Sequence, residues 1–264
     1  MILKIGNSET VFVIEANPRA SRTVPFISKA IGVPLVKVAA RVMLGETLSD
    51  LRENGMLVGS KPHSHTAVKE AVLPFNRFPE TDAILGPEMR STGEVMGIDI
   101  TPGLAFVKSQ IAAGMSLPEN GTVFLSVADR DKEIGVETAK LLTQLGFTIA
   151  ATSGTAAVLS ENKIEVTDVV AKLGDKSGIT ALELIESGKV GLVINSPRGR
   201  GPRADGAHIR KAAGERGVPL LTTASSGLAL AKGLVDWRTH PLKVRPLQHF
   251  HYSQSLKQSK LDFD

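Results

Sequence analysis

The chain contains no cysteine and few aromatic residues, since only 4% of its 264 residues are Phe, Trp or Tyr. Without cysteine there is no thiolate nucleophile, no Cys-ligated zinc site, no iron–sulfur centre and no disulfide. The scarcity of aromatic rings argues against a surface on which nucleic-acid bases stack. A chain of this length with 42% hydrophobic residues nevertheless buries enough surface to form a core without metal or disulfide cross-links.

Long hydrophobic runs are also absent, because no apolar stretch approaches the roughly 18 residues of a membrane helix. The opening sequence MILKIGNSET lacks the basic segment and the long apolar run of a secretion signal. We therefore expect a cytoplasmic protein that does not contact a membrane. The net charge of +4 and the pI near 9.3 suit an anionic ligand, but they are too mild and too evenly spread to indicate nucleic-acid binding.

The first part of the chain predicts one strand and two helices. Residues 10–15 (TVFVIE) have the composition of a strand, but no partner strand precedes them, so the chain looks like the end of something longer. Residues 23–31 and 34–44 carry apolar side chains at helical spacing. Gly32 and Gly45 follow them as typical helix stop signals.

The sequence then becomes irregular. Residues 55–102 are dense in turn residues, as in GSKPHSH and LPFNRFPETD, and we predict loops packed on a scaffold. Residues 104–113 predict a short helix, and the following MSLPENG predicts a linker.

From residue 122 onward, short apolar runs alternate with amphipathic segments, which is the pattern of parallel β/α units. The expected strands are residues 122–127, 148–151, 166–170, 190–195 and 219–223, and the expected helices are residues 132–145, 155–159, 179–187, 207–216 and 226–234. Runs such as GLVIN and VFLSV suit strands covered on both faces. We predict a five-stranded parallel α/β domain with its binding site at the carboxyl edge of the sheet.

The end of the chain shows no apolar periodicity, and we expect residues 237–264 to form an extended or disordered tail. Two H-x-H pairs, His63 with His65 and His249 with His251, lie in irregular sequence without an acidic ligand set. We interpret them as surface histidines, with metal binding as a lesser alternative.

A basic cluster between Arg198 and Arg216 begins with the glycine-rich segment RGRGPR. Asp205 and Glu215 interrupt the cluster and no aromatic residue accompanies it. We therefore favour a mobile loop beside an anion site over a nucleic-acid surface.

Oxygen ligands follow the first predicted strand. Glu15 and Asn17 lie two residues apart, which places both side chains on one face of an extended segment, and Arg19 continues the series. Such oxygens hold Mg²⁺ against nucleotide phosphates, and a guanidinium can contact a phosphate. From the residues alone, an ordinary strand-to-turn junction explains the pattern better.

Residues 152–155 (TSGT) place two hydroxyl side chains around Gly154 at a predicted strand-to-helix turn. Backbone N–H groups at a helix start, assisted by hydroxyls, can hold a phosphate, although a helix cap needs only one of these hydroxyls. Other polar residues are expected at the same edge of the sheet. Together the candidates for a nucleoside monophosphate site are Ser126, Lys132, Thr152, Gly154, Thr155, Lys172, Asn195 and Asp205.

Three segments, IEANPRASRTVPFISKAIGVPL, VKEAVLPFNRFP and LGPEMRSTGEVMG, strongly resemble the large subunit of glutamine-hydrolysing carbamoyl phosphate synthetase. The resemblance implies an α/β chain. Residues 1–113 would be the C-terminal segment of its second ATP-grasp module, residues 114–236 a Rossmann-like, methylglyoxal-synthase-like regulatory domain, and residues 237–264 the tail.

By this resemblance, Glu15 and Asn17 match metal ligands for Mg²⁺ or Mn²⁺ in an ATP site, and Arg19 matches a phosphate contact in the catalytic site. A further metal-binding Gln of the family is replaced here by Leu3, and the glycine-rich phosphate cover and its lysines are missing. We therefore expect no tightly bound cofactor and no carbamoyl phosphate synthesis by the isolated chain. The implied partners are the rest of the large subunit and the glutaminase small subunit.

The resemblance also implies that the candidates at the sheet edge bind UMP or IMP as a regulatory effector. Glu70 and Leu73 match positions near an ornithine activator pocket. The partner segment of that pocket fits poorly, because Pro219, Leu220 and Leu221 precede Thr222 and Thr223 where the family carries a polar run. After Asn195, Ser196 and Pro197 replace the Thr–Thr pair that the family often has.

In the complete enzyme, the family phosphorylates bicarbonate, combines it with ammonia from glutamine and phosphorylates the resulting carbamate, for pyrimidine and arginine biosynthesis. A different hypothesis is a free-standing lyase of the methylglyoxal synthase type, which needs carboxylates and an imidazole. His208 is the only histidine in the core of the predicted domain, and Asp168, Asp175 and Asp205 are the candidate carboxylates. A third is a binding module that completes the ATP-grasp fold of a partner chain.

Overall fold

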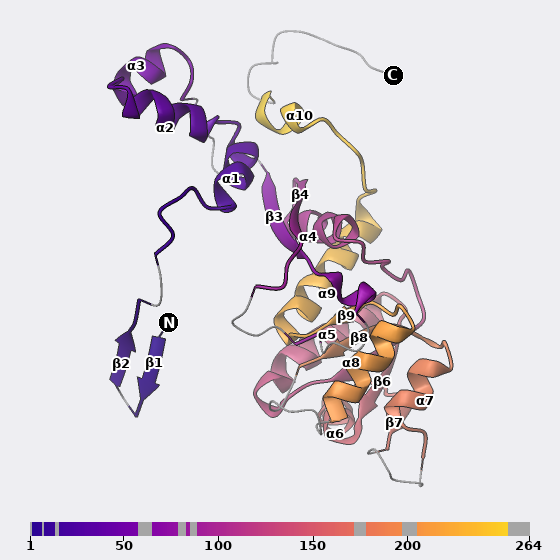
Figure 1. Ribbon diagram of the computed structural model, residues 1–264. Helices are drawn as coiled ribbons and strands as arrows, with labels where there is room; N and C mark the ends of the chain where they lie inside the picture. The colour runs from indigo at the N-terminus through magenta and orange to yellow at the C-terminus, as the bar shows by residue number, and fades with distance from the viewer. Residues whose placement is uncertain are drawn as a thin grey trace. The chain divides into compact units, whose positions relative to one another are not determined.

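The computed structural model describes residues 2–6, 8–13, 16–57, 65–78, 83–84, 89–171, 178–196 and 205–252. The chain divides into two compact units, Met1–Ser60 and Lys61–Asp264, and each is described by itself (Figure 1).

The first unit begins with a hairpin. Strand β1 (Ile2–Ile5) pairs antiparallel with β2 (Ser8–Val11), and Gly6 between them has a φ of 59°. The prediction of a strand over residues 10–15 without an earlier partner is therefore wrong, because the strand begins at residue 8 and β1 precedes it. Gly6, with its positive φ, permits the tight turn between the two short strands. The composition of β1 alone does not indicate a strand.

Three helices follow, namely α1 (Thr23–Ile31), α2 (Leu35–Met43) and α3 (Leu48–Glu53). The first two were predicted, and Gly32 and Gly45 follow them with φ values of 73° and 99°. The third was missed. Its signal is a capping box in which the Thr47 hydroxyl accepts from the Asp50 backbone N–H and the Asp50 carboxylate accepts from the Thr47 N–H. The Thr47 hydroxyl and the Thr47 N–H both donate to the Asp50 carboxylate, and these two hydrogen bonds lower the pKa of Asp50.

Within the first unit, a small apolar cluster joins these helices through Val33, Val38 and Leu51. Among the described residues, no single helix is long and apolar enough to cross a membrane, and α1 with α2 meets the length and composition test only as a pair bent by 108°.

The second unit begins with two antiparallel strands, β3 (Thr66–Val72) and β4 (Gly93–Asp99), and a short 3₁₀ turn, η1 (Pro74–Arg77). The prediction of loops over residues 55–102 is wrong for these segments. The two strands lie far apart in sequence, so their pairing is not marked by a short turn between them.

Helix α4 (Pro102–Ala112) packs between β4 and α9 (Ala224–Thr239). On the strand side, a Cβ on Gly97 would lie 2.0 Å from the carbonyl oxygen of Ala105. On the helix side, Gly103 meets Gly233 so closely that a Cβ on Gly103 would lie 3.0 Å from the Gly233 Cα. Glycines on both sides therefore let α4 approach its neighbours closely.

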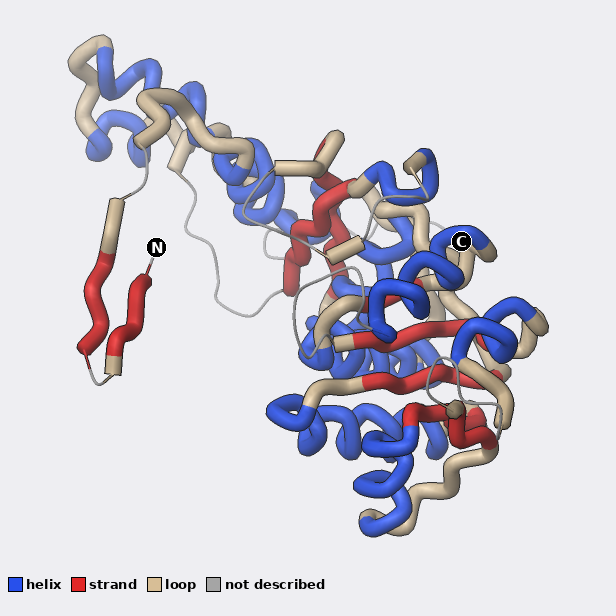
Figure 2. Tube along the Cα trace, turned by 60° about the horizontal axis from the view of Figure 1, so that its bottom comes forward, coloured by secondary structure: helices blue, strands red, loops and turns tan. Residues whose placement is uncertain are grey.

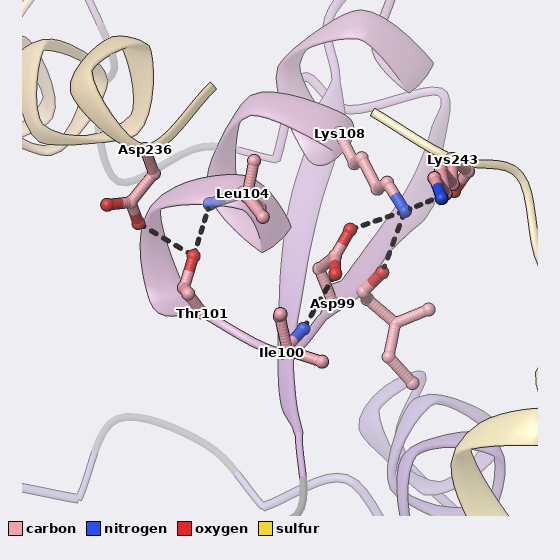
Figure 3. Close-up of polar contacts among 8 residues, drawn as sticks. Asp99, Ile100, Thr101, Leu104, Lys108, Asp236 and Lys243 are labelled. Atoms are coloured by element: carbon pink, nitrogen blue, oxygen red, sulfur yellow. Dashed lines mark hydrogen bonds and ion pairs between the residues drawn. The ribbon is translucent and has the colours of Figure 1, made fainter. Parts of the chain in front are cut away.

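Polar contacts surround this helix (Figure 3). The Thr101 hydroxyl accepts from the Leu104 N–H at the start of α4 and donates to Asp236 of α9 over 2.6 Å. The ammonium of Lys108 lies 2.6 Å from the buried carboxylate of Asp99 at the end of β4. These contacts tie β4, α4 and α9 together, and the boundary predicted between residues 113 and 114 stays a prediction.

The remainder of the second unit is the predicted parallel domain. Its strands are β5 (Thr122–Ser126), β6 (Thr148–Thr152), β7 (Asp168–Val170), β8 (Val190–Asn195) and β9 (Leu220–Leu221). Besides α9, its helices are η2 (Asp129–Asp131), α5 (Lys132–Gln144), α6 (Ser153–Glu161), α7 (Ala181–Glu186) and α8 (Asp205–Glu215). The sheet has the order β7-β6-β5-β8-β9, and all four pairings are parallel, which confirms the five-stranded prediction.

Helices cover both faces of this sheet, as Figure 2 shows with strands in red between helices in blue. Alternate residues of β5 illustrate the two cores, because Val123 and Leu125 belong to the cluster that contains residues of α5, α6 and α9. Phe124 belongs to the cluster that contains residues of α7 and α8. Burial on both faces accounts for the near-continuous apolar character of the central strands.

The end of the described chain is not a featureless tail. Helix α9 continues to Thr239, and α10 (Leu247–Tyr252) follows, so the prediction for residues 237–264 is wrong over these segments. Phe250 is 6% exposed, and its ring centroid lies 5.8 Å from that of His65. His251 also lies near His65, with ring centroids 6.3 Å apart. The two half-buried histidines are therefore not the independent surface residues that we expected, and α10 buries the Phe250 ring where periodicity gave no signal.

Candidate anion-binding site at the carboxyl edge of the sheet

The order of the strands indicates where a ligand-binding crevice is expected, namely at the carboxyl ends of β5 and β8. The chain proceeds from β5 to β6 and β7 on one side, and from β8 to β9 on the other. Ligands of open parallel α/β sheets bind at such a reversal, outside the carboxyl ends of the strands. Ser126 and Asn195 are register partners at the ends of these two strands, so both lie where the prediction placed them.

Thr155 is shared by three groups at this edge. Its hydroxyl oxygen accepts from the Lys132 ammonium over 2.7 Å, from the Thr152 hydroxyl over 3.2 Å and from the Val127 backbone N–H over 3.3 Å. The Thr155 residue is 1% exposed. The structure thus brings together three of the predicted residues, which come from the start of α5, the end of β6 and the first turn of α6.

The alternative interpretation of residues 152–155 as a simple helix cap does not describe this turn. Thr152 is the N-cap residue of α6, but its side chain makes no capping hydrogen bond and instead donates to Thr155. A helix start leaves backbone N–H groups without intrahelical partners and carries a partial positive charge. With the Lys132 ammonium directed to the same turn, the arrangement favours an anion such as a phosphate.

The β8 side of the site is built from buried polar groups. Asn195 is 2% exposed, and its Nδ2 donates to the Ser126 carbonyl oxygen over 3.3 Å. Ser196, 4% exposed, accepts from the Ala128 N–H through its hydroxyl oxygen over 2.9 Å. Ser196 therefore joins the ends of β5 and β8.

Sequence reasoning missed Arg210 at this site. It was counted in the basic cluster beside the anion site, and the helix predicted over residues 207–216 contains it. The structure places it in α8, where it is 3% exposed and donates from Nη1 to Asn195 Oδ1 over 2.7 Å. The available signal was its position next to Ile209 and three residues before Ala213 on the apolar face of the helix. Residues 197–204 of that cluster lie outside the described residues.

The structure does not place every predicted residue at this edge. Lys172 lies outside the described residues, and Asp205 begins α8 with its side chain outside them. Glu70 lies on β3, where its carboxylate accepts from Gln110 Nε2 over 2.7 Å, and its role in an activator pocket stays a prediction. Thr223, from the expected partner segment of that pocket, caps α9 by accepting from the Ser226 N–H.

The predicted metal and ATP residues belong to the first unit. Glu15 lies outside the described residues, and Asn17 and Arg19 are exposed. Arg19 Nη1 donates to the neighbouring Ala20 carbonyl over 3.4 Å. Within the described ranges, no group of three His, Cys, Asp or Glu side chains is arranged to hold a metal ion. The metal site proposed from Glu15 and Asn17 stays a prediction.

The lyase hypothesis depended on an imidazole in the domain core. His208 is exposed on α8, and Asp168 is half-buried at the start of β7, on the edge strand of the sheet. The structure therefore does not place His208 in the core as that hypothesis expected.

Comparison with known proteins finds two family matches in different parts of the chain. Residues 135–222 match the family described as MGS-like domain, and residues 3–51 match the carbamoyl-phosphate synthase L chain, ATP binding domain. The MGS-like match thus covers β6 to β9 of the parallel sheet, and the ATP-binding match covers the hairpin and the first helices.

The proteins that match most of this chain include carbamoyl phosphate synthase large chains. That of Synechocystis sp. is 48% identical over 92% of this chain and 22% of its own length. Those of Micrococcus luteus and Mycobacterium tuberculosis are 50% and 48% identical over 91% and 92% of this chain, and each is covered over 23% of its length. The chain thus spans less than a quarter of these relatives. The chain is homologous to carbamoyl phosphate synthase large chains and matches their C-terminal portion, including the MGS-like domain.

Proposed function

We propose that the parallel α/β domain is a regulatory domain that binds a nucleoside monophosphate of the UMP or IMP type at the carboxyl edge of its sheet. The observation that carries the proposal is the 2.7 Å contact between the Lys132 ammonium and the buried Thr155 hydroxyl in the first turn of α6. This contact places a cation, a hydroxyl and a helix start at one point of the switch between β5 and β8.

The phosphate would lie against this turn, where a dianion is stabilised by the Lys132 charge and by the N–H groups of α6. Asn195 lies at the end of the neighbouring strand β8, and Asp205 begins the next helix, so both are proposed to contact the sugar or base. The proposal includes Lys172 as a second phosphate contact.

We propose further that this chain acts within a longer polypeptide that makes carbamoyl phosphate from bicarbonate and ammonia at the expense of ATP, with a glutaminase subunit as partner. The nucleotide can influence that reaction only through its different affinities for the active and inactive arrangements, typically worth about 1–3 kcal/mol. The chain alone is expected to form no carbamoyl phosphate from ATP, bicarbonate and ammonia. Product formation above the rate of a blank, measured with labelled bicarbonate, would contradict this expectation.

Calorimetric titration of the purified chain with UMP and with IMP tests the regulatory site. We expect Lys132→Met to weaken binding by about 30-fold or more, the loss expected for a hydrogen bond to a charged group. Lys140→Met is the matched control, because Lys140 is exposed on the same helix. It should bind like the wild type. A folded wild-type chain that releases no heat with either nucleotide would refute the effector proposal.

A further inference from the structure

The buried polar pair formed by Arg210 and Asn195 suggests a role that residue types alone do not assign. We infer that Arg210 is a positioning residue that fixes the side-chain amide of Asn195, so that Asn195 offers the effector an N–H group and not its carbonyl oxygen. The inference rests on the proposed function and adds a determinant of which ligand atoms this side of the site accepts.

Two neighbours hold the amide from opposite sides. Arg210 Nη1 lies 2.7 Å from Asn195 Oδ1, and Asn195 Nδ2 lies 3.3 Å from the Ser126 carbonyl oxygen. Arginine has only donors, whereas a backbone carbonyl has only acceptors. The flipped amide would place N–H groups against the guanidinium and an oxygen against the carbonyl. Both neighbours therefore require the same orientation of the Asn195 amide.

The burial of the pair makes this orientation costly to reverse. Arg210 and Asn195 are 3% and 2% exposed, so water does not readily replace a lost hydrogen bond. Gly206, one turn before Arg210 in α8, leaves the space in which they meet. A Cβ on Gly206 would lie 2.7 Å from Arg210 Nη1 and 3.2 Å from Asn195 Oδ1. The absence of a side chain there is thus part of the arrangement.

The orientation limits what Asn195 can do for a ligand. Its oxygen is engaged by Arg210, and one of the two Nδ2 hydrogens is directed to Ser126. The second hydrogen is the group that remains for an oxygen of the sugar or base. In this arrangement Asn195 acts as a donor, which suits a ligand rich in acceptor oxygens and disfavours a ligand that presents an N–H at this point.

Three variants of the full chain test the inference. Arg210→Met keeps a long side chain but removes every donor, Arg210→Lys keeps a charged donor, and Lys211→Met changes the exposed neighbour that pairs with Glu215. Two measurements are made on each. One is the side-chain NH₂ signal of Asn195 in a ¹H–¹⁵N spectrum, assigned by its loss in Asn195→Ser, and the other is the affinity for UMP by calorimetry.

We expect Arg210→Met to shift or broaden the Asn195 NH₂ signal and to weaken UMP binding about tenfold, while Arg210→Lys restores most of both. Lys211→Met should match the wild type. A merely structural role of Arg210 would spread signal changes over the domain and would leave the Asn195 signal no more affected than others.

The inference is overturned if Arg210→Met, folded by its spectrum, leaves the Asn195 signal and the UMP affinity unchanged, or if Arg210→Lys is as impaired as Arg210→Met. A wild-type chain that binds no nucleotide would instead refute the proposed function and, with it, the role of this pair in ligand selection. In that case the Asn195 signal in Arg210→Met still shows whether the amide is fixed by Arg210, so the two failures are distinguishable.

Discussion

Replacing Gly97 with alanine is expected to lower the free energy of unfolding by about 3 kcal/mol, the upper part of the range for a side chain forced into a packed site. The new Cβ would lie 2.0 Å from the Ala105 carbonyl oxygen and 2.5 Å from the Ser109 backbone nitrogen. Both atoms belong to the backbone of α4, so no rotation of a side chain relieves the clash. Either α4 moves away from β4 or the strand bends, and each disrupts the contacts that Thr101 and Lys108 make with other elements.

Gly93→Ala is the matched control for this experiment. Gly93 begins the same strand and has no atom within 4 Å of its ideal Cβ position. We expect this variant to unfold within about 0.5 kcal/mol of the wild type, as for ordinary surface substitutions. Urea unfolding followed by circular dichroism compares the two variants. Equal stabilities for Gly97→Ala and Gly93→Ala would show that α4 does not pack on β4 as closely as the structure has it.

The parts of the fold that the sequence predicted well are those whose signals are local. The alternation of apolar runs and amphipathic helices marks each β/α unit of the parallel domain, and β8 begins and ends where the pattern placed it. The pairing of β3 with β4 was missed, because Gly93 and Gly97 look like turn residues in the sequence. At Gly97 the glycine instead serves close packing against α4, which only the tertiary structure reveals.

The same division applies to the candidate site. The TSGT segment predicts a polar strand-to-helix turn. Lys132 lies beside this turn, because helices that follow parallel strands begin at the same edge of the sheet. Arg210 was not found, since a basic residue in a basic cluster is normally solvated. What removes it from solvent is the packing of α8 against the sheet, with Ile209 in the core. Arg210 Nη1 donates to Asn195, fifteen residues earlier.

Thr155→Val is expected to destabilise the parallel domain by about 2–3 kcal/mol, the cost of leaving the buried Val127 N–H without its acceptor. The substitution keeps the shape of a side chain that is 1% exposed and removes only the oxygen. The Val127 N–H then loses its hydrogen-bond partner next to the end of β5, and the Lys132 ammonium loses its contact. Because the same oxygen organises the proposed phosphate turn, UMP should no longer raise the thermal midpoint of the variant.

Thr138→Val separates this effect from the loss of a buried hydroxyl in general. Thr138 is also 1% exposed, but its hydroxyl donates to the Ile134 carbonyl of its own helix, which belongs to the helical backbone ladder. Its removal leaves no donor without a partner, so the expected cost is about 1 kcal/mol or less. Thermal unfolding of both variants with and without UMP makes the comparison. Similar losses of stability in the two variants would show that the three contacts of Thr155 do not stabilise this edge of the sheet. An unchanged response of Thr155→Val to UMP would show that the Thr155 hydroxyl does not form part of the nucleotide site.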